Sequence, residues 1–379
     1  NLFPRDNLII LLDLGSSHLE ELSKLKNTVF VLDHHEIGNN PKNLVILNPH
    51  LYKEYQDLCS AELTYLVSKE ISEENKDLAK LAILGMIGDT MEKNITPLRN
   101  QIIRDSEVRI KKGVLIYPST RPLNKTLEYS SRPFIPGVTG DSKGTYEILN
   151  EAGIERVGKY HKALIDLNET EMKNLATAIT LRLSEKEASK YLGNLYLLKF
   201  FNKIEDAREI SAIINACSRM DQPQIALLTC LGNSSARKKA EKVYVKYRQH
   251  IISGLKYIEN NGNIEGKKYI IINTRDNVKD TIIGTLASIL SFSSVYQEGT
   301  VIIAMAYNQD KIKVSARMSG RNPSYARNLR ELMDSITHTL GHGESGGHKN
   351  AAGCTIKIEH EDRFIDLVKR KLEVEMVRV

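Results

Sequence analysis

The stretch Leu11–His35, LLDLGSSHLEELSKLKNTVFVLDHH, decides the fold of the first part of the chain. It joins two apolar runs of strand character, Leu8–Leu12 and Thr28–Leu32, and Ser16 and Ser17 can cap a helix between them. Strands and helices continue to alternate up to about residue 115. This alternation predicts an α/β fold with a parallel, doubly wound sheet.

Ionisable side chains follow both strands of this stretch. Asp13 follows the first run, and Asp33, His34 and His35 follow the second. Because parallel sheets place ligands just beyond the carboxyl ends of their strands, we expect these side chains to lie together. Asp89 ends another apolar segment and adds a third acid. Carboxylates suit Mg²⁺ and Mn²⁺, and imidazole shifts the preference toward Mn²⁺, Zn²⁺ or Fe²⁺, so the pattern predicts a metal site.

Simpler roles exist for each of these residues. A single aspartate after a strand is often a helix N-cap, and adjacent histidines can have structural partners. Neither role explains three acids and a histidine pair at successive turns. A pair of metal ions roughly 3.5–4 Å apart can activate a water and stabilise the leaving oxygen in phosphoester hydrolysis.

The rest of the chain predicts two further domains. The first domain is expected over residues 1–140, a helical insertion with a long linker helix over 141–262, and a second α/β domain over 263–379. Residues 116–140 contain four prolines and are loop-like, but they are hydrophobic enough to pack on a surface. Periodicity leaves open whether Leu81–Ile87 forms a buried helix or a buried strand.

Three features of the later segments are candidates for function. The long run Ser235–Glu259 has a basic face, for which a solvated helix surface is the alternative. The segment Gly341–Gly353, GHGESGGHKNAAG, is predicted to be a glycine-rich loop whose backbone can meet a phosphate, although a flexible turn explains it equally well. Arg317 follows the strand pattern KIKVSA and can face that phosphate or simply lie on the surface.

Composition is typical of a globular protein with a sizeable core. Hydrophobic residues make up 41% and charged residues 26% of the 379 residues. The four cysteines are scattered without a CxxC pair, and the start does not resemble a signal peptide, so we expect a cytoplasmic protein without a membrane anchor. The formal net charge of +6 suits a polyanionic partner.

The motifs resemble those of the DHH phosphoesterase superfamily. Asp33-His34-His35 is its naming motif, DLGSS and GDT match the aspartate motifs around it, and SAR followed by GGHKNAAG matches the DHH-associated C-terminal domain. A finer resemblance is to the archaeal RecJ-like nucleases, including those that associate with GINS. That resemblance rests on RPLNKTLEYSSRPFIPGVTG and NACSRMDQPQIALLTCLGN.

The resemblance implies a role for each candidate. Asp13 would bridge two metal ions, with His34 and Asp89 as further ligands. His35 would contact the scissile phosphate, and Asp33 would orient the histidines. The nucleic acid would be held by the residues Arg317, Gly346, Gly347 and His348.

The resemblance also implies a first motif, a His followed by an acid pair, some tens of residues before Asp13. This chain does not contain it, and we expect the sheet to expose part of its core there. A fragment, an interrupted gene or a protein that no longer cuts would each explain the difference. The retained acids and histidines favour catalysis, since a scaffold has no chemical need for them.

The function expected from the resemblance is a Mn²⁺- or Mg²⁺-dependent exonuclease for single-stranded DNA or RNA in replication or repair. One alternative is a catalytically inactive replisome scaffold that binds GINS or the replicative helicase complex. The other is a phosphodiesterase for small oligonucleotides or cyclic dinucleotides, which the large insertion disfavours.

Overall fold

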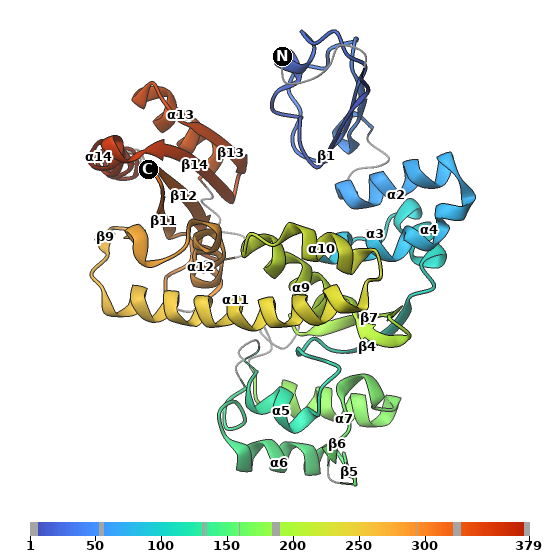
Figure 1. Ribbon diagram of the computed structural model, residues 1–379. Coiled ribbons are helices and arrows are strands. Elements are labelled where there is room, and N and C mark those ends of the chain that lie inside the picture. The colour runs from blue at the N-terminus through green and yellow to red at the C-terminus, as the bar shows by residue number, and fades with distance from the viewer. Residues whose placement is uncertain are drawn as a thin grey trace. The chain divides into compact units, whose positions relative to one another are not determined.

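The computed structural model divides into two compact units, which are described separately (Figure 1). Unit 1 consists of Asn1–Asn215 and Leu227–Arg237, and unit 2 of Ala216–Ala226 and Lys238–Val379. The structure describes residues 7–52, 57–130, 133, 135–158, 160–183, 190–293, 295–320 and 327–374.

Unit 1 begins with a three-stranded parallel sheet of β1 (Ile9–Leu12), β2 (Val29–Leu32) and β3 (Val45–Leu47), in that order. Parallel pairing confirms the prediction from the alternating pattern. The short helix α1 (Leu19–Leu22) lies between β1 and β2 in the chain. Ser16 and Ser17 do not cap it, because His18 occupies the N-cap position without a side-chain hydrogen bond.

The two faces of this sheet differ in burial. Ile9, Val29 and Val31 form a small core with Leu19 of α1. Three apolar residues of β1 and β3 are exposed: Ile10, Leu12 and Val45. Residues i and i+2 of a strand share a face, so the exposure follows one side of the sheet.

Three helices follow the sheet: α2 (Ser60–Ile71), α3 (Ala79–Gly88) and α4 (Pro97–Asp105). The apolar segment Leu81–Ile87, left open between helix and strand, lies within helix α3. The six buried side chains of α3 belong to a core shared with α2, α4, β7 (Leu192–Phe200) and α9 (Ala207–Arg219). A helix that is apolar on nearly all sides is expected where packing surrounds it.

A buried ion pair joins α2 to α4. Glu62 and Arg99 are both 0% exposed, with Arg99 Nε–Glu62 Oε1 at 2.7 Å and Arg99 Nη2–Glu62 Oε2 at 2.8 Å. Glu62 also accepts a hydrogen bond from the backbone N–H of Cys59, the N-cap of α2. The bidentate geometry satisfies both carboxylate oxygens, which a charged pair needs once it is removed from water.

The remainder of unit 1 mixes helices and strands. Its elements are β4 (Arg109–Val114), α5 (Leu123–Glu128), α6 (Ser142–Glu151), β5 (Arg156–Val157), β6 (Tyr160–His161), α7 (Glu169–Thr180), β7 (Leu192–Phe200) and β8 (Lys203–Asp206). An antiparallel sheet in the order β4-β7-β8 is packed against α5, α6 and α7.

One prediction differs from the structure in this region and another is incomplete. The segment 116–140 was predicted to be loop-like, but it contains helix α5, and it packs as expected, with five of its residues in a buried cluster. The segment 141–262 is mainly helical, as predicted, but it also contains the strands β5 to β8. Residues 116–138 and 148–197 share one core. Pairing of β7 with the distant β4 is invisible to a local sequence window.

Three helices connect the two units: α9 (Ala207–Arg219), α10 (Pro223–Cys230) and the 27-residue α11 (Ser234–Asn260). All three confirm helices expected from apolar spacing. From Lys238 onward α11 belongs to unit 2. No helix in the described part of the chain is long and apolar enough to cross a membrane.

Unit 2 is built on one mixed sheet, in the order β13-β14-β12-β11-β10-β9. Its elements are β9 (Ile264–Gly266), β10 (Tyr269–Asn273), α12 (Asp280–Phe292), β11 (Val301–Asn308), β12 (Lys311–Met318), α13 (Leu329–Leu340), β13 (Glu344–His348), β14 (Ala351–Lys357) and α14 (Glu361–Val374). β11 and β12 form the expected hairpin, with Gln309 and Asp310 at the turn.

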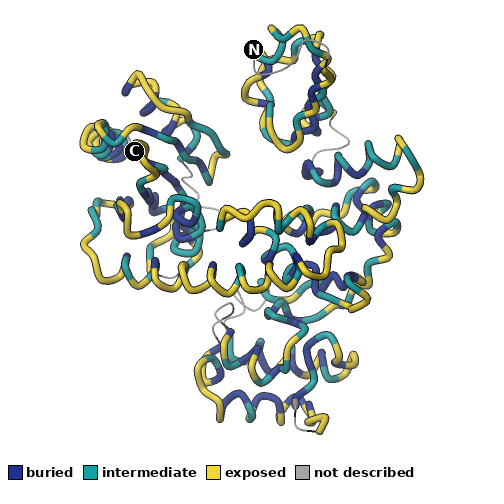
Figure 2. Tube along the Cα trace, viewed as in Figure 1, coloured by how far each residue is buried: buried dark blue, intermediate teal, exposed yellow. Residues whose placement is uncertain are grey.

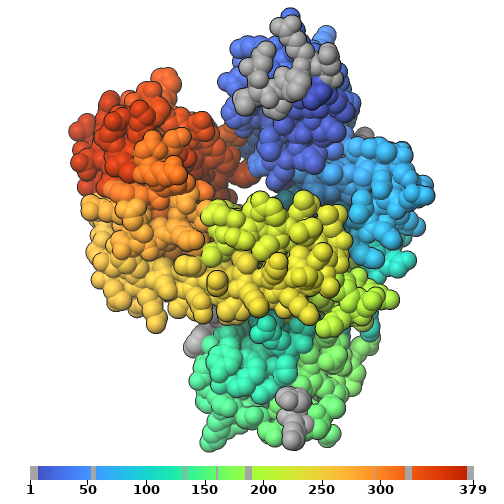
Figure 3. Space-filling model, in the orientation of Figure 1, coloured from blue at the N-terminus to red at the C-terminus, as the bar shows by residue number. Residues whose placement is uncertain are grey.

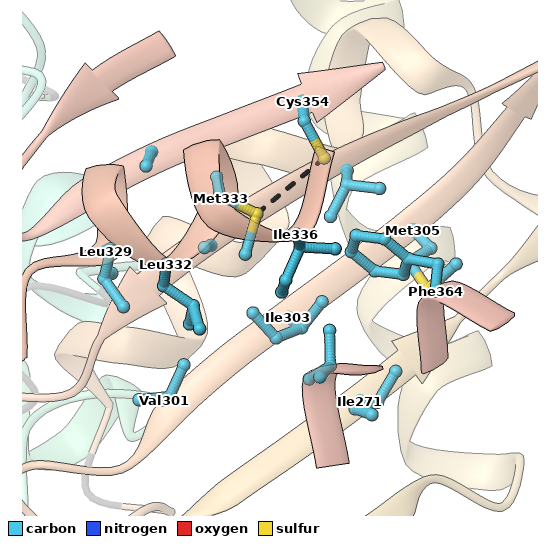
Figure 4. Packing of buried hydrophobic residues seen from close by; sticks show 14 of the residues in the cluster. Ile271, Val301, Ile303, Met305, Leu329, Leu332, Met333, Ile336, Cys354 and Phe364 are labelled. Carbon is cyan, nitrogen blue, oxygen red and sulfur yellow. Dashed lines mark hydrogen bonds between the residues drawn. The ribbon is translucent and has the colours of Figure 1, made fainter. Parts of the chain in front are cut away.

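Helices cover both faces of this sheet. One face packs against α13 and α14, and Figure 4 shows Ile303, Ile336 and Phe364 meeting in that layer, with Cys354 Sγ 3.8 Å from Met333 Sδ. The other face packs against α12 and α11 through the alternate residues of β10 and β11. The buried positions form continuous dark stretches in Figure 2.

The predicted glycine-rich loop Gly341–Gly353 is instead mostly a β-hairpin. β13 and β14 pair antiparallel, with Gly346 opposite Gly353 and His348 opposite Ala351. Glycine weakens a strand because it has no side chain to pack. The neighbouring strand β12 nevertheless pairs with β14 along seven residue pairs and fixes the hairpin.

The buried Glu62–Arg99 pair gives a stability prediction. Replacing Glu62 by glutamine should lower the free energy of unfolding of unit 1 by about 3–5 kcal/mol, because it leaves a buried guanidinium uncompensated. Urea unfolding followed by circular dichroism measures this change. The exposed pair Lys143–Glu147 is the control, since Glu147→Gln should cost less than about 1 kcal/mol. Equal effects of the two substitutions would contradict the prediction.

Candidate metal centre

The ionisable side chains lie where the strands end. Asp13 directly follows β1, and Asp33 directly follows β2. The backbone of Asp13 has φ 63°, a left-handed conformation that aspartate tolerates better than most residues. Its N–H still donates to the carbonyl of Leu32 at 2.9 Å, which continues the ladder between the strands. The pairing of β1 with β2 therefore fixes the backbone position of Asp13, from which its carboxylate projects.

The ring of His34 lies between two carboxylates. His34 Nε2 is 3.5 Å from Asp13 Oδ1 and 3.9 Å from Asp89 Oδ2. Asp89 follows the last residue of α3, where its N–H bonds to the carbonyl of Gly85. Asp13, His34 and His35 also form a group whose potential ligand atoms lie within 4.8 Å of one another. Asp13, His34 and Asp89, which are far apart in the sequence, therefore lie together as predicted, although Asp89 follows a helix.

Asp33 has a different environment from the other acids. Its side chain is 1% exposed, whereas that of Asp13 is 64% exposed. It accepts hydrogen bonds from the backbone N–H groups of Ser16 (3.0 Å), His34 (2.8 Å) and His35 (3.3 Å), and from His35 Nδ1 (2.6 Å). With both oxygens engaged, Asp33 orients its neighbours and is not placed to coordinate an ion.

The electrostatics of the three groups follow from these contacts. Burial would raise the pKa of Asp33, but the hydrogen bonds from His35 and Ser16 outweigh it and lower that pKa. The hydrogen bond to Asp33 raises the pKa of His35 against the opposing effect of burial. Burial raises the pKa of Asp89, and the negative charge of Asp13 raises it further. A cation between Asp13 and Asp89 would relieve this repulsion.

Asn48 supports the same edge of the sheet, and the sequence analysis did not select it. It directly follows β3 and is 0% exposed. Its Nδ2 donates to Ser16 Oγ at 3.0 Å and to the carbonyl of His35 at 2.9 Å. Its position one residue beyond a strand is the signal that singled out Asp13 and Asp33, so the same rule would have found it.

The loop that begins at Asp89 is held by Arg99. Besides Glu62, the guanidinium of Arg99 donates to the carbonyls of Met91 (3.0 Å), Asn94 and Asp57. All five N–H donors of the side chain therefore have acceptors. Glu62 and Arg99 are 37 residues apart, and no local pattern indicated the pair. The clamp fixes the backbone immediately after Asp89.

These residues suit a hard divalent cation. The exposed carboxylates of Asp13 and Asp89 flank the imidazole of His34. The buried carboxylate of Asp33 holds the neighbouring ring of His35, as carboxylates that support metal-binding groups do. Oxygen and imidazole donors match Mn²⁺ and, with water completing the coordination, Mg²⁺. Asp13, His34 and Asp89 are the side chains in position to hold such an ion.

The remaining candidate residues lie in unit 2, where the sheet aligns three of them. Arg317 of β12, Ala351 of β14 and His348 of β13 lie side by side across the three strands. Two residues further along the strands, Gly353 pairs with Gly346 on the same face of the sheet. A Cβ on Gly353 would lie 2.7 Å from the Val314 carbonyl, whereas the space at Gly346 is open. Gly347 points to the opposite face, because successive residues alternate along a strand.

Arg317 is half-buried and well anchored. Its Nε donates to Ser288 Oγ of α12 at 2.9 Å, and its Nη1 donates to the carbonyls of Ala316 and Ala352. Burial lowers its pKa, and the charge of Arg219 lowers it further. Arg219 is thus a second cation near Arg317. Arg219 lies in the stretch NACSRM, and no role was predicted for it from the sequence.

Three family models match successive parts of the chain. The DHH family N-terminal domain matches residues 1–86, the DHH-CID domain residues 116–192, and the DHHA1 domain residues 266–374. An uncharacterized protein of Methanocaldococcus jannaschii is 26% identical over 97% of this chain and 80% of its own length.

Solved structures share the fold at low sequence identity. RecJ from Thermus thermophilus in complex with Mn²⁺ gives a TM-score of 0.55 at 17% identity, over 96% of this chain and 44% of that chain. Cdc45 from Entamoeba histolytica gives a TM-score of 0.58 at 12% identity, over 96% of this chain and 84% of that one. The chain therefore spans less than half of the Thermus protein. It is a DHH-family protein of RecJ-like fold, with DHH, DHH-CID and DHHA1 domains in that order.

Proposed function

We propose that this protein is a metal-dependent exonuclease that hydrolyses phosphodiester bonds of single-stranded DNA or RNA in replication or repair. The observation that carries the proposal is the convergence of Asp13, His34 and Asp89, with His35 fixed beside them by Asp33. A divalent cation bound there would lower the pKa of water and neutralise charge on phosphate oxygens.

The side chains around that position have separate tasks in this proposal. Asp13, His34 and Asp89 hold Mn²⁺ or Mg²⁺. With Nδ1 of His35 bonded to Asp33, Nε2 is the ring nitrogen that contacts the scissile phosphate. Because Asp33 favours the protonated form of His35, this ring can donate a hydrogen bond to the phosphate as negative charge develops.

Unit 2 would hold the strand. Gly346, Gly353 and Ala351 present a surface of small residues, which lets a sugar–phosphate backbone approach the sheet closely. Arg317, with Arg219 near it, supplies positive charge beside this surface, and His348 lies in the same row of the sheet as Arg317. Phosphate contacts of this kind position a strand without selecting its sequence.

A catalytically inactive replisome scaffold that binds GINS is the second candidate. The fold similarity to Cdc45 favours it. The buried hydrogen-bond network beneath His34 and His35 favours the nuclease, since a scaffold does not require Asp33 to hold the backbone of His34 and the imidazole of His35.

The nuclease proposal predicts loss of activity on removal of an ion-holding side chain. Asp13→Ala and His34→Ala should each reduce Mn²⁺-dependent release of nucleotides from a single-stranded oligonucleotide to the metal-free background. His50→Ala is the matched control, because His50 is exposed and only its backbone N–H has a described hydrogen bond. Near wild-type activity in either of the first two variants would overturn the assignment.

The same assay separates the candidate functions. The wild-type protein should release nucleotides from long single strands faster than it cleaves dinucleotides, and chelation with EDTA should stop both reactions. Absence of release with Mn²⁺ and Mg²⁺ would support the scaffold. Faster cleavage of dinucleotides would support a small-substrate phosphodiesterase.

The buried position of Asp33 predicts a different kind of loss. Asp33→Asn keeps the shape but removes the negative charge and turns one of the two acceptor oxygens into an NH2 donor, so the affinity for Mn²⁺ should fall by about 10- to 100-fold. Titration with Mn²⁺ followed by electron paramagnetic resonance measures this affinity. The exposed Asp77→Asn is the control. An unchanged affinity in Asp33→Asn would show that the network does not position the ligands.

A further inference from the structure

Helix α11 concentrates the positive charge of the chain. It contains seven lysine or arginine residues against two glutamates, so its formal charge of +5 accounts for most of the net +6 of all 379 residues. Figure 3 shows the helix in yellow at the surface. The charge is therefore a local property of one helix and not an even distribution over the protein.

The helix separates this charge from its packing side. Tyr247 and Ile258 are buried in the core formed with α12, β10 and β11, and Tyr247 Oη lies 3.0 Å from Thr285 Oγ1. Gly254 allows close packing, since a Cβ there would lie 2.7 Å from Leu286. Six cations lie on the exposed residues of the helix: Lys238, Lys239, Lys242, Lys246, Arg248 and Lys256.

None of the six exposed cations has an acidic partner within ion-pair distance in the described residues, although Glu241 and Glu259 lie in the same helix. By contrast, Arg237 pairs with Glu205. Lys238, Lys242 and Lys246 follow one another at intervals of four residues, so they are neighbours on one face. Like charges at this spacing repel and destabilise a helix. A bound polyanion would remove this repulsion. A helix face that only contacts water has no need of a row of like charges.

We propose that the exposed face of α11 binds the phosphate backbone of single-stranded nucleic acid. This inference rests on the proposed function for the identity of the polyanion. Lys238 to Lys256 spans about 27 Å at the rise of an α-helix. Along the axis of a B-form helix one strand carries a phosphate about every 3.4 Å, so a strand with that rise would place roughly eight nucleotides along the face.

The composition of the face favours nucleic acid over a membrane surface. A helix that lies in a membrane uses its apolar face for that purpose, but the apolar face of α11 is buried in unit 2. Only two large apolar residues are exposed between Lys238 and Lys256: Val245 at 55% and Ile252 at 52%. The dominant chemistry of the exposed face is positive charge.

The test compares two charge-matched triple variants. Lys238→Gln/Lys242→Gln/Lys246→Gln removes the central cations, and its fold should be retained because glutamine and lysine have similar helix propensity. Lys112→Gln/Lys173→Gln/Lys203→Gln removes three exposed lysines of unit 1 and lowers the net charge equally. Binding of fluorescent dT6 and dT30 is measured with EDTA present, so the result does not depend on cleavage.

The proposal predicts that the α11 variant loses more affinity for dT30 than for dT6, because only dT30 is long enough to span the whole face, and that the control keeps both affinities. Losing three phosphate contacts should make binding of dT30 less salt-dependent. Between 50 and 200 mM salt the wild-type affinity should fall about twentyfold more than that of the variant, by counterion release.

Several outcomes would overturn the proposal: unchanged dT30 binding in the α11 variant, no dT30 binding by the wild type, or equal losses in the control variant. Loss of binding to phosphatidylserine vesicles with dT30 binding intact would assign the face to membranes instead. Absence of cleavage by a wild-type protein that binds dT30 through α11 would contradict only the proposed function.

Discussion

The buried carboxylate of Asp33 is the interaction on which the candidate site depends. It lies at the end of the central strand of the parallel sheet and accepts hydrogen bonds from the loop after β1 and from the two residues that follow it. One charged group therefore links two strand ends, holds the backbone of His34 and orients the imidazole of His35. Charged hydrogen-bond acceptors are stronger than neutral ones, and inside the protein the network rigidifies what it connects. Asn48 extends this network to the end of β3.

The part of the site carried by local patterns could be predicted from the sequence. Apolar runs that end in Asp13 and Asp33 indicated strands whose carboxyl ends meet, and the structure brings Asp13 and His34 together with Asp89. Asp89 follows a helix and not a strand. Periodicity could not distinguish the two, because the apolar segment before Asp89 is buried on nearly all sides and so has no alternating polar face. The strand-end rule also applied to Asn48, although only acids and histidines were selected.

The parts that depend on distant contacts could not be predicted. Arg99 and Glu62 meet across 37 residues, and their pairing fixes the loop after Asp89. The glycines of β13 have little strand preference of their own, and their structure comes from pairing with β14, which β12 holds in register. In the same way, β7 pairs with β4 through contacts far apart in the sequence, so the insertion expected to be helical contains a sheet. In each case tertiary pairing outweighs local preference.

Most of the formal net charge resides in α11, whereas the cluster in unit 1 is acidic and suited to a cation. An acidic ion site and a basic helix face are the two elements that a nuclease needs to hold both its metal and its polyanionic substrate. The most direct measurement of the central claim is a crystal structure of the protein grown with Mn²⁺, with anomalous scattering recorded at the manganese edge. The account predicts a peak in contact with Asp13, His34 and Asp89, and with Asp33 outside the coordination sphere. No peak there, or a peak coordinated by Asp33 in place of Asp13, would contradict it.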